Sequence, residues 1–184
     1  MTLDRTVPPF APIGLAELLA RAELLTRTDR KYLLPGADLP VLLRALPTGT
    51  RVLEIDGRRR FAYRSAYFDT PGLDSYLASA RRRRRRFKLR VRGYLDTGQQ
   101  FVELKTRGAR NTTVKSRFPY AGSADRLDPA TRDLASSLLA AAAMPPVTGE
   151  FQLTLVTTYE RMTLILPGTA TRVTVDRELA WQLP

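Results

Sequence analysis

The chain has 184 residues, which suits one domain, and 43% of them are hydrophobic, enough to form a packed core. It contains neither cysteine nor histidine, which excludes disulfides, thiol nucleophiles, imidazole acid–base catalysis and Cys or His metal sites. Any metal must therefore be bound through oxygen, and the net charge of +12 favours polyanionic partners: nucleic acid, an acidic membrane or phosphate chains.

The start of the chain and its hydropathy indicate a cytoplasmic protein. Residues 1–12 lack the apolar stretch of a signal peptide and are expected to form a flexible tail, followed by a single domain over residues 13–184. No stretch approaches the roughly 18 uninterrupted apolar residues of a membrane span, so no transmembrane segment is expected.

The first part of the domain predicts two helices and three strands. In chain order they are a helix over 14–26, a short strand over 27–34, a helix that begins after Asp38 and ends at Pro47, and a hairpin of strands 50–55 and 60–69. Leucines at helical spacing indicate the first helix, and Asp56-Gly57 supplies the turn of the hairpin.

The second part predicts a short helix, a strand meander, a long helix and two final strands. Thr70-Pro71 and Asp128-Pro129 both match a helix cap followed by proline at the first helical position. The predicted elements are a helix from Thr70 through Leu77, strands 86–95, 100–106 and 113–120, a helix from Asp128 to about Met144, and strands 152–166 and 171–179. The arginines at 81–85 are interpreted as a solvated loop that steers anions.

Lysine usage marks the candidate chemistry. All four lysines, Lys31, Lys88, Lys105 and Lys115, fall on predicted strands, while every other Lys or Arg cation is an arginine. Because a compact, strongly hydrated ammonium differs from a planar guanidinium, a chain that otherwise uses arginine is expected to keep lysine where its chemistry is needed.

Strict alternation puts cations on one face of several predicted strands. The same-face sets are Arg86, Lys88, Arg90 and Arg92; Glu103 and Lys105; Lys115 and Arg117; Tyr159 and Arg161; Arg172, Asp176 and Glu178; and Arg27, Asp29 and Lys31. If the sheet closes into a barrel, these faces point into one lumen that suits a slender phosphate chain. Glu103 among the cations would then hold a divalent metal on phosphate oxygens.

Each pattern also has a simpler interpretation. An alternating basic strand is commonly the solvated face of a sheet, Glu103 and Lys105 fit a salt-bridge pair, and Asp176 fits a surface carboxylate. Aromatic residues near cations, such as Tyr94 and Phe101, suit base stacking but more commonly form core, and no helix-turn-helix or RNP-like pattern supports nucleic acid as the partner.

Six motifs occur together in an order and spacing that point to a known family. They are Arg27-x-Asp29-x-Lys31-Tyr32, Ser65-Ala66-Tyr67-Phe68-Asp69-Thr70, Arg86-x-Lys88-x-Arg90-x-Arg92-x-Tyr94, Glu103-Leu104-Lys105, Lys115-x-Arg117 and Tyr159-Glu160-Arg161. Over about residues 27–178 they resemble the vacuolar transporter chaperone (VTC) domain, the polyphosphate polymerase branch of the triphosphate tunnel metalloenzyme, or CYTH-like, superfamily.

The resemblance implies an α+β fold, an antiparallel β-barrel or triphosphate tunnel flanked by helices. It implies transfer of the γ-phosphoryl group of ATP to polyphosphate with Mn²⁺ or Mg²⁺, with ATP and inorganic polyphosphate or triphosphate as partners. By motif, Lys31, Arg90, Arg92, Lys105, Lys115 and Arg161 would grip phosphates, and Tyr159 would line the same wall.

Together with the strand patterns, this defines the candidate site. Its catalytic residues are Lys31, Lys88, Arg90, Arg92, Lys105 and Arg161; its substrate-binding residues are Arg27, Arg86, Lys115, Arg117 and Tyr159; and its metal ligands are Glu103 and Asp176. The other functions left open are a non-catalytic polyphosphate or polyanion receptor and a triphosphatase acting on triphosphate or NTP.

The chain departs from the family pattern at two places. Asp29 stands where the family usually has Glu, and a later E-x-K strand with a closing helix, whose Glu is the expected metal ligand, is not present before Pro184. The phosphate donor, the length of the product and the oligomeric state are not determined by the sequence.

Overall fold

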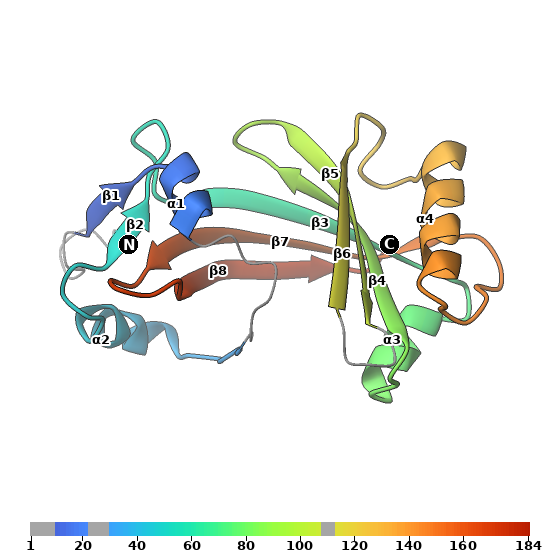
Figure 1. Cartoon of the computed structure of the whole chain (residues 1–184), viewed down its shortest axis with the longest axis horizontal. Helices are drawn as coiled ribbons and strands as arrows, with labels where there is room; N and C mark the ends of the chain where they lie inside the picture. The colour runs from blue at the N-terminus through green and yellow to red at the C-terminus, as the bar shows by residue number, and fades with distance from the viewer. Residues whose placement is uncertain (1–9, 22–29, 108–112) are drawn as a thin grey trace. The chain divides into compact units, whose positions relative to one another are not determined.

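The computed structural model describes residues 10–21, 30–107 and 113–184, which form two compact units (Figure 1). The first contains the described residues up to Phe61 together with Arg161–Asp176, and the second contains Ala62–Glu160 with Arg177–Pro184. The single domain expected over residues 13–184 stays a prediction. Each unit is described separately.

Short strands and helices build the first unit. They are β1 (Ala11–Ile13), α1 (Leu15–Arg21), a 3₁₀ turn (Gly36–Asp38), α2 (Leu39–Arg44), β2 (Arg51–Leu53), the C-terminal part of β7 (Gln152–Ile165) and the start of β8 (Arg172–Gln182). β1 pairs parallel with β2, and β2 pairs antiparallel with β7. Apolar residues such as Leu43, Val52 and Leu164 are almost fully buried between these elements.

Three predictions in this unit differ from the structure. Phe10 is buried and residues 11 and 12 belong to β1, so these residues are not part of a flexible tail. Residues 27–29 of the predicted strand lie outside the described residues, and residues 30–34 form no strand. Leu33 is fully exposed there, which leaves its apolar side chain without the burial that stabilises a strand. The predicted hairpin is also wrong, because β2 pairs with β1 and β7.

An antiparallel meander builds the second unit. Its elements are β3 (Phe61–Asp69), α3 (Asp74–Ala80), β4 (Arg86–Tyr94), β5 (Gln99–Arg107), β6 (Thr113–Pro119) and α4 (Pro129–Ala141), with the first part of β7 and the end of β8. β4 pairs antiparallel with β3 and β5, and β5 pairs antiparallel with β6. The hairpin turn between β4 and β5 contains Gly98 at φ 68°, a backbone conformation that favours glycine.

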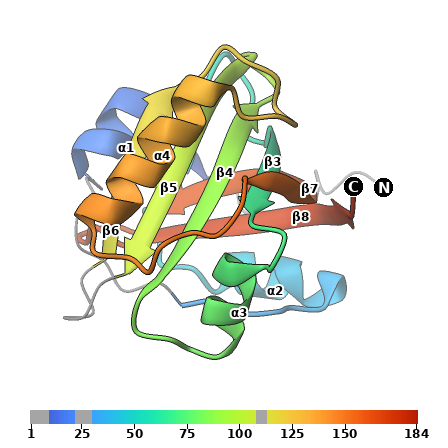
Figure 2. The same ribbon diagram turned by 90° about the vertical axis from the view of Figure 1, so that its right-hand side faces the viewer.

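One face of the meander is buried beneath α4. Phe87, Leu89 and Val91 of β4 form a single apolar cluster with residues of β5 and with Ala135 and Leu139 of α4. Figure 2 shows α4 lying across β4 and β5. Because neighbouring residues of a strand point to opposite faces, the cations of β4 lie on the face away from α4.

Two aspartates determine where helices α3 and α4 begin beside this sheet. The Asp128 carboxylate accepts a hydrogen bond from the Thr131 amide at 2.7 Å, as the predicted cap requires. The helix predicted from Thr70 begins later, at Asp74, because the buried carboxylate of Asp69 accepts hydrogen bonds from the amides of Thr70, Ser75 and Tyr76. Asp69 therefore ties the end of β3 to the start of α3.

The predicted fold class is confirmed. The structure is α+β, with mainly antiparallel strands flanked by helices. Taken by themselves, the described strands of the first unit follow the order β1-β2-β7 and those of the second follow β7-β3-β4-β5-β6, while β8 pairs with β7 off this path, and neither order closes on itself. The basic face of the second unit is therefore one face of a curved, open set of strands.

Candidate phosphate-binding site

Three of the four lysines occupy the same register position on three neighbouring strands. Lys88 of β4 is the partner of Lys105 on β5, and Lys105 is the partner of Lys115 on β6. Directly opposed residues project from the same face, and adjacent strands lie about 4.8 Å apart. Lys88, Lys105 and Lys115, here called the lysine row, are all exposed on the face opposite α4.

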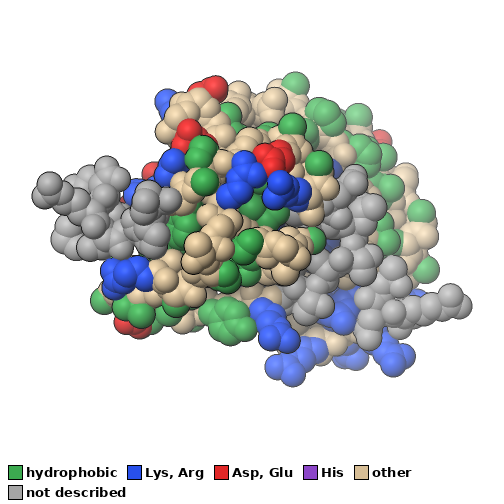
Figure 3. Space-filling model, turned by 60° about the vertical axis from the view of Figure 1, so that its left-hand side comes forward, with side chains coloured by type: hydrophobic (Ala, Val, Ile, Leu, Met, Phe, Trp, Pro, Cys, Tyr) green, Lys and Arg blue, Asp and Glu red, His purple; other side chains and the backbone are tan. Residues whose placement is uncertain are grey.

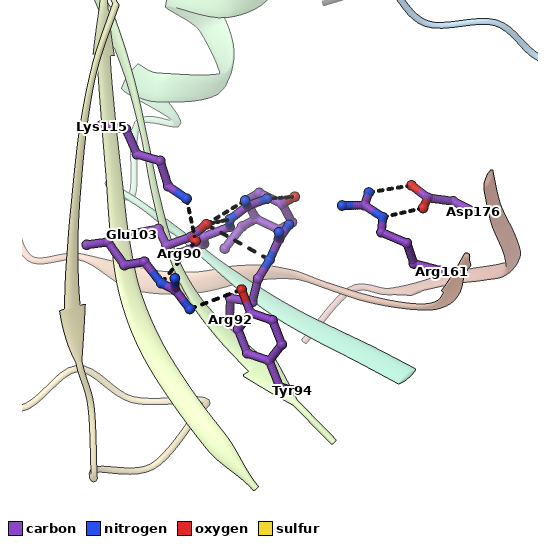
Figure 4. Close-up of polar contacts among 9 residues, drawn as sticks. Arg90, Arg92, Tyr94, Glu103, Lys115, Arg161 and Asp176 are labelled. Carbon is purple, nitrogen blue, oxygen red and sulfur yellow. Dashed lines mark hydrogen bonds and ion pairs between the residues drawn. The ribbon is translucent and has the colours of Figure 1, made fainter. Parts of the chain in front are cut away.

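The next register position on this face places a carboxylate among arginines. Arg90 of β4, Glu103 of β5 and Arg117 of β6 are successive cross-strand partners, and Tyr67 of β3 lies opposite Arg90. Lys115 reaches across from the lysine row to the same carboxylate. Arg90, Arg92, Lys115 and Arg117 around Glu103 are called the basic cluster (Figure 4).

Glu103 is the buried centre of the basic cluster. Its Oε2 accepts hydrogen bonds from Nε and Nη2 of Arg90, at 2.8 and 2.6 Å, and its Oε1 accepts one from Nζ of Lys115 at 2.7 Å. The Nε atoms of Arg92 and Arg117 lie 3.9 and 3.8 Å from its carboxylate oxygens. The Glu103 side chain is 3% exposed.

These cations hold Glu103 ionised. Burial by itself raises the pKa of a carboxyl group, but the charges of Arg90 and Arg92 and the hydrogen bonds from Lys115 and Arg90 outweigh it and lower the pKa of Glu103 to about 2. One carboxylate is thus surrounded by four cationic side chains, and the basic cluster keeps a net positive charge at neutral pH.

Arg90 also acts on a tyrosine. Its Nη1 donates a hydrogen bond to the Tyr67 hydroxyl at 3.1 Å, and its guanidinium lies 5.7 Å from the centre of the Tyr67 ring. Burial raises the pKa of Tyr67, but the charges of Arg90, Arg92 and Lys88 exceed that effect and lower it. Burial lowers the pKa of Arg90, but its interactions with Glu103 and Tyr67 raise it by more, so the pKa of Arg90 lies above its ordinary value.

Arg92 has hydrogen-bonding capacity that Glu103 does not use. The Arg92 side chain is 12% exposed, and its buried Nε has no hydrogen-bond partner. Its guanidinium lies 5.6 Å from the centre of the Tyr63 ring. A mostly buried guanidinium with a free N–H is a donor that a phosphate oxygen can satisfy.

An aromatic wall borders the cations. Tyr63 stacks on Tyr159 with ring centroids 5.2 Å apart and planes 5° apart, and Tyr94 packs edge-on against Phe101. Arg117 lies 3.7 Å from the centre of the Phe101 ring. Tyr159 thus lies against Tyr63 in the second unit, and its role in lining the site stays a prediction. Tyr63 and Tyr67 were missed, although their alternation along β3 places them on one face.

The remaining candidate residues have different surroundings. Arg86 is half-buried at the start of β4, where its Nη1 donates to the Arg83 carbonyl at 2.7 Å. In the first unit, Lys31 is exposed outside any helix or strand, and Arg161 forms a two-bond ion pair with Asp176 at 2.6 and 2.7 Å. Arg27 and Asp29 lie outside the described residues. The phosphate-binding roles of Lys31 and Arg161 stay predictions.

The arrangement of the carboxylates does not fit a preformed metal site. Within the described ranges, no group of three or more Asp, Glu, His or Cys side chains is placed to hold a metal ion. Both oxygens of Glu103 accept hydrogen bonds from cations, and Asp176 is engaged by Arg161. A divalent metal at Glu103 would have to displace Arg90 or Lys115, so the predicted metal ligands stay a prediction that these contacts do not favour.

The excess of basic over acidic residues in the composition is visible on the molecular surface. In Figure 3, Lys and Arg side chains are more prominent than Asp and Glu on the face shown. Among the described residues, no helix has the length and apolar character needed to cross a membrane.

Comparison with known proteins supplies the family. A family model described as the VTC domain matches residues 26–183, which is most of the chain, and this agrees with the resemblance found in the motifs. No curated protein matched the chain. The family points to a polyphosphate-related function. The chain belongs to the VTC domain family.

Proposed function

We propose that the protein is a polyphosphate polymerase that transfers the γ-phosphoryl group of ATP to a polyphosphate chain bound on the basic face of the second unit. The observation that carries the proposal is the lysine row, Lys88, Lys105 and Lys115, next to the basic cluster. Like charges at the facing positions Lys88 and Lys105 repel, which costs stability unless anions lie near them, and Lys115 already has one such anion in Glu103. A phosphate chain supplies such anions at short, regular spacing.

The residues of the face suit different parts of this ligand. The exposed lysines supply compact point charges, whereas Arg90 and Arg92 are held in place by Tyr67 and Tyr63 and suit fixed contacts to phosphate oxygens. The Nε of Arg92, which makes no hydrogen bond in the protein, lies 3.9 Å from the Glu103 carboxylate within the basic cluster.

Phosphoryl transfer requires alignment and charge neutralisation more than covalent chemistry by the protein. In the proposed reaction, a terminal oxygen of polyphosphate forms a bond to the γ-phosphorus of ATP, and the bond from that phosphorus to the β–γ bridging oxygen breaks. ADP leaves with the bonding electrons, and polyphosphate becomes one unit longer. The attacking oxygen is already anionic, so the absence of histidine and cysteine does not prevent the reaction.

A non-catalytic polyphosphate receptor is the second candidate, and one observation favours it. Glu103, the carboxylate expected to place a metal, is neutralised by Arg90 and Lys115, and the described residues form no group of three or more carboxylates placed to hold a metal ion. A receptor needs the cations but no metal ligand.

Incubation of the purified protein with ATP and Mn²⁺ or Mg²⁺ tests the proposal. The polymerase predicts long phosphate chains and ADP, a triphosphatase predicts orthophosphate, and a receptor predicts binding of added polyphosphate without turnover. Lys88→Met and Arg92→Met should remove product formation while the circular dichroism spectrum is retained. Arg126→Gln, which removes an exposed cation on a loop near α4, is the control and should keep full activity.

A further inference from the structure

Glu103 has a position that neither a metal ligand nor an ordinary surface salt bridge explains. Its side chain is 3% exposed, whereas the side chains of the cations around it are progressively more open: Arg92 at 12%, Arg90 at 23%, Arg117 at 41% and Lys115 at 50%. The carboxylate therefore lies beneath a layer of cations that faces solvent.

Its oxygens occupy donors that a phosphate needs. Nε and Nη2 of Arg90 both point at Oε2, and Nζ of Lys115 points at Oε1. These are charge-assisted contacts of 2.6 to 2.8 Å, the geometry in which guanidinium and ammonium groups bind phosphate oxygens. One carboxylate thus engages two of the four cations directly and holds the other two at 3.8 to 3.9 Å.

We propose that Glu103 is an internal counter-anion that competes with phosphate oxygens for Arg90 and Lys115, and so determines how strongly an anion must bind to occupy the basic cluster. This inference rests on the proposed phosphate-binding function of the same face. In the free protein Glu103 offsets the mutual repulsion of the four cations. When a phosphate chain binds, Arg90 and Lys115 exchange the carboxylate for phosphate oxygens, and the like charges of Glu103 and the ligand repel each other.

The alternative is that Glu103 serves only to position the cations. In that case a phosphate would bind above the cation layer while Arg90 and Lys115 keep their contacts with the carboxylate. The two roles predict opposite effects of removing the charge: loss of a competitor strengthens anion binding, and loss of a positioning group weakens it.

The test compares Glu103→Gln with Glu150→Gln. Both substitutions remove one negative charge from a carboxylate that pairs with an arginine in the second unit, but Glu150 pairs with Arg132 at 2.6 Å, and Arg132 belongs to α4, which covers the opposite face of the sheet. Isothermal titration of the full chain with tripolyphosphate should show affinity raised at least about tenfold in Glu103→Gln, because a unit charge at such short range is removed. In Glu150→Gln the affinity should stay within about twofold of the unmodified protein.

Every outcome decides between these possibilities. Equal or weaker binding by Glu103→Gln, with the unmodified protein binding normally, overturns the inference and leaves the proposed function intact. Binding of tripolyphosphate by Glu103→Gln but not by the unmodified protein supports the inference, because the Glu103 carboxylate would then prevent phosphate from binding to the unmodified protein. Absence of binding in both proteins overturns the inference together with the proposed function.

A second variant covers the case in which Glu103→Gln does not fold. Glu103→Asp keeps the charge but shortens the side chain by one methylene, which weakens its contacts with Arg90 and Lys115. The expected result is tighter tripolyphosphate binding than in the unmodified protein, by less than in a charge-removing variant. Unchanged or weaker binding by a folded Glu103→Asp protein overturns the inference.

Discussion

Lys88 of β4 lies directly opposite Lys105 of β5, on the face of the sheet that α4 leaves uncovered. Two like charges at facing positions of an antiparallel pair are unfavourable. Lys115, which lies opposite Lys105 on the next strand, differs because its Nζ donates to the Glu103 carboxylate. A fold that retains this arrangement gives up stability in the free state. Binding of an anion between Lys88 and Lys105 offsets their repulsion and restores that stability.

Removal of one lysine should therefore stabilise the free protein. We expect Lys88→Met to raise the free energy of unfolding by up to about 1 kcal/mol at low ionic strength, because the repulsion from Lys105 is lost. The gain should shrink as salt is added, since exposed charges are screened. Thermal or urea unfolding over a salt series measures it. A loss of stability in Lys88→Met at low salt would show that the opposed lysines do not repel in the way proposed.

The lowered pKa of Glu103 predicts that the folded protein loses stability in acid. Its pKa falls from an ordinary value of 4.5 to about 2 on folding, so the unfolded chain binds the proton more readily. The resulting stability, about 3 kcal/mol, is fully present above about pH 5 and is lost as the pH falls toward 2. Urea unfolding between pH 7 and pH 2 should show the stability difference between the unmodified protein and Glu103→Gln decreasing over that window. A difference that is constant with pH would contradict it.

Asp69 is predicted to be structural, although it lies in a motif shared with the VTC family. Its carboxylate accepts hydrogen bonds from the amides of Thr70, Ser75 and Tyr76, and it is 4% exposed. Asp69→Ala should lower the free energy of unfolding by roughly 2–3 kcal/mol, because buried amides lose a charged acceptor.

The affinity for tripolyphosphate separates this role from ligand binding. Below its melting temperature, the folded Asp69→Ala protein should bind tripolyphosphate within about threefold of the unmodified protein, because the Asp69 carboxylate is bonded to the amides of Thr70 and of the start of α3. Wild-type stability combined with lost binding would place Asp69 in the phosphate site instead.

Metal binding gives a further prediction at Glu103. Since Arg90 and Lys115 already engage its two oxygens, removal of the Glu103 charge should not weaken the binding of Mn²⁺ to the phosphate-free protein. Titration of Mn²⁺ into the unmodified protein and into Glu103→Gln, followed by the relaxation rate of water protons, compares them directly. A tight site in the unmodified protein that disappears in Glu103→Gln would restore Glu103 as a metal ligand.

Local patterns were sufficient to predict the strands that carry the site. The alternation from Arg86 to Tyr94 predicted both β4 and the separation of its cations from Phe87, Leu89 and Val91, because side-chain direction depends only on the period of the strand. The same period along β5 and β6 placed Glu103, Lys105 and Lys115 on consistent faces of their own strands.

The register between strands could not be derived in the same way. It depends on hairpin geometry, here the turn with Gly98 in a left-handed conformation, and a shift of two residues would preserve every face while moving Lys105 away from Lys88. The wrong prediction of a hairpin between residues 50–55 and 60–69 has a related cause. Asp56-Gly57 does form a tight turn, bridged between Ile55 and Arg58, but the partners of β2 are β1 and β7, and the latter pairing joins residues far apart in sequence.

The role of Glu103 could not be predicted from the pattern of one strand alone. A Glu two residues before a Lys fits a metal ligand or a salt bridge equally well. Only the pairing of three strands shows that Arg90 and Lys115 approach it from opposite sides.

The binding of tripolyphosphate as a function of salt, in the unmodified protein and in the Lys88→Met/Lys105→Met double variant, tests the central claim most directly. If phosphate chains bind along the lysine row, the double variant should bind at least about tenfold more weakly and show a shallower dependence of log affinity on log salt, because fewer counterions are released. Equal affinity and equal salt dependence in the two proteins would contradict the claim that this face holds the phosphate chain.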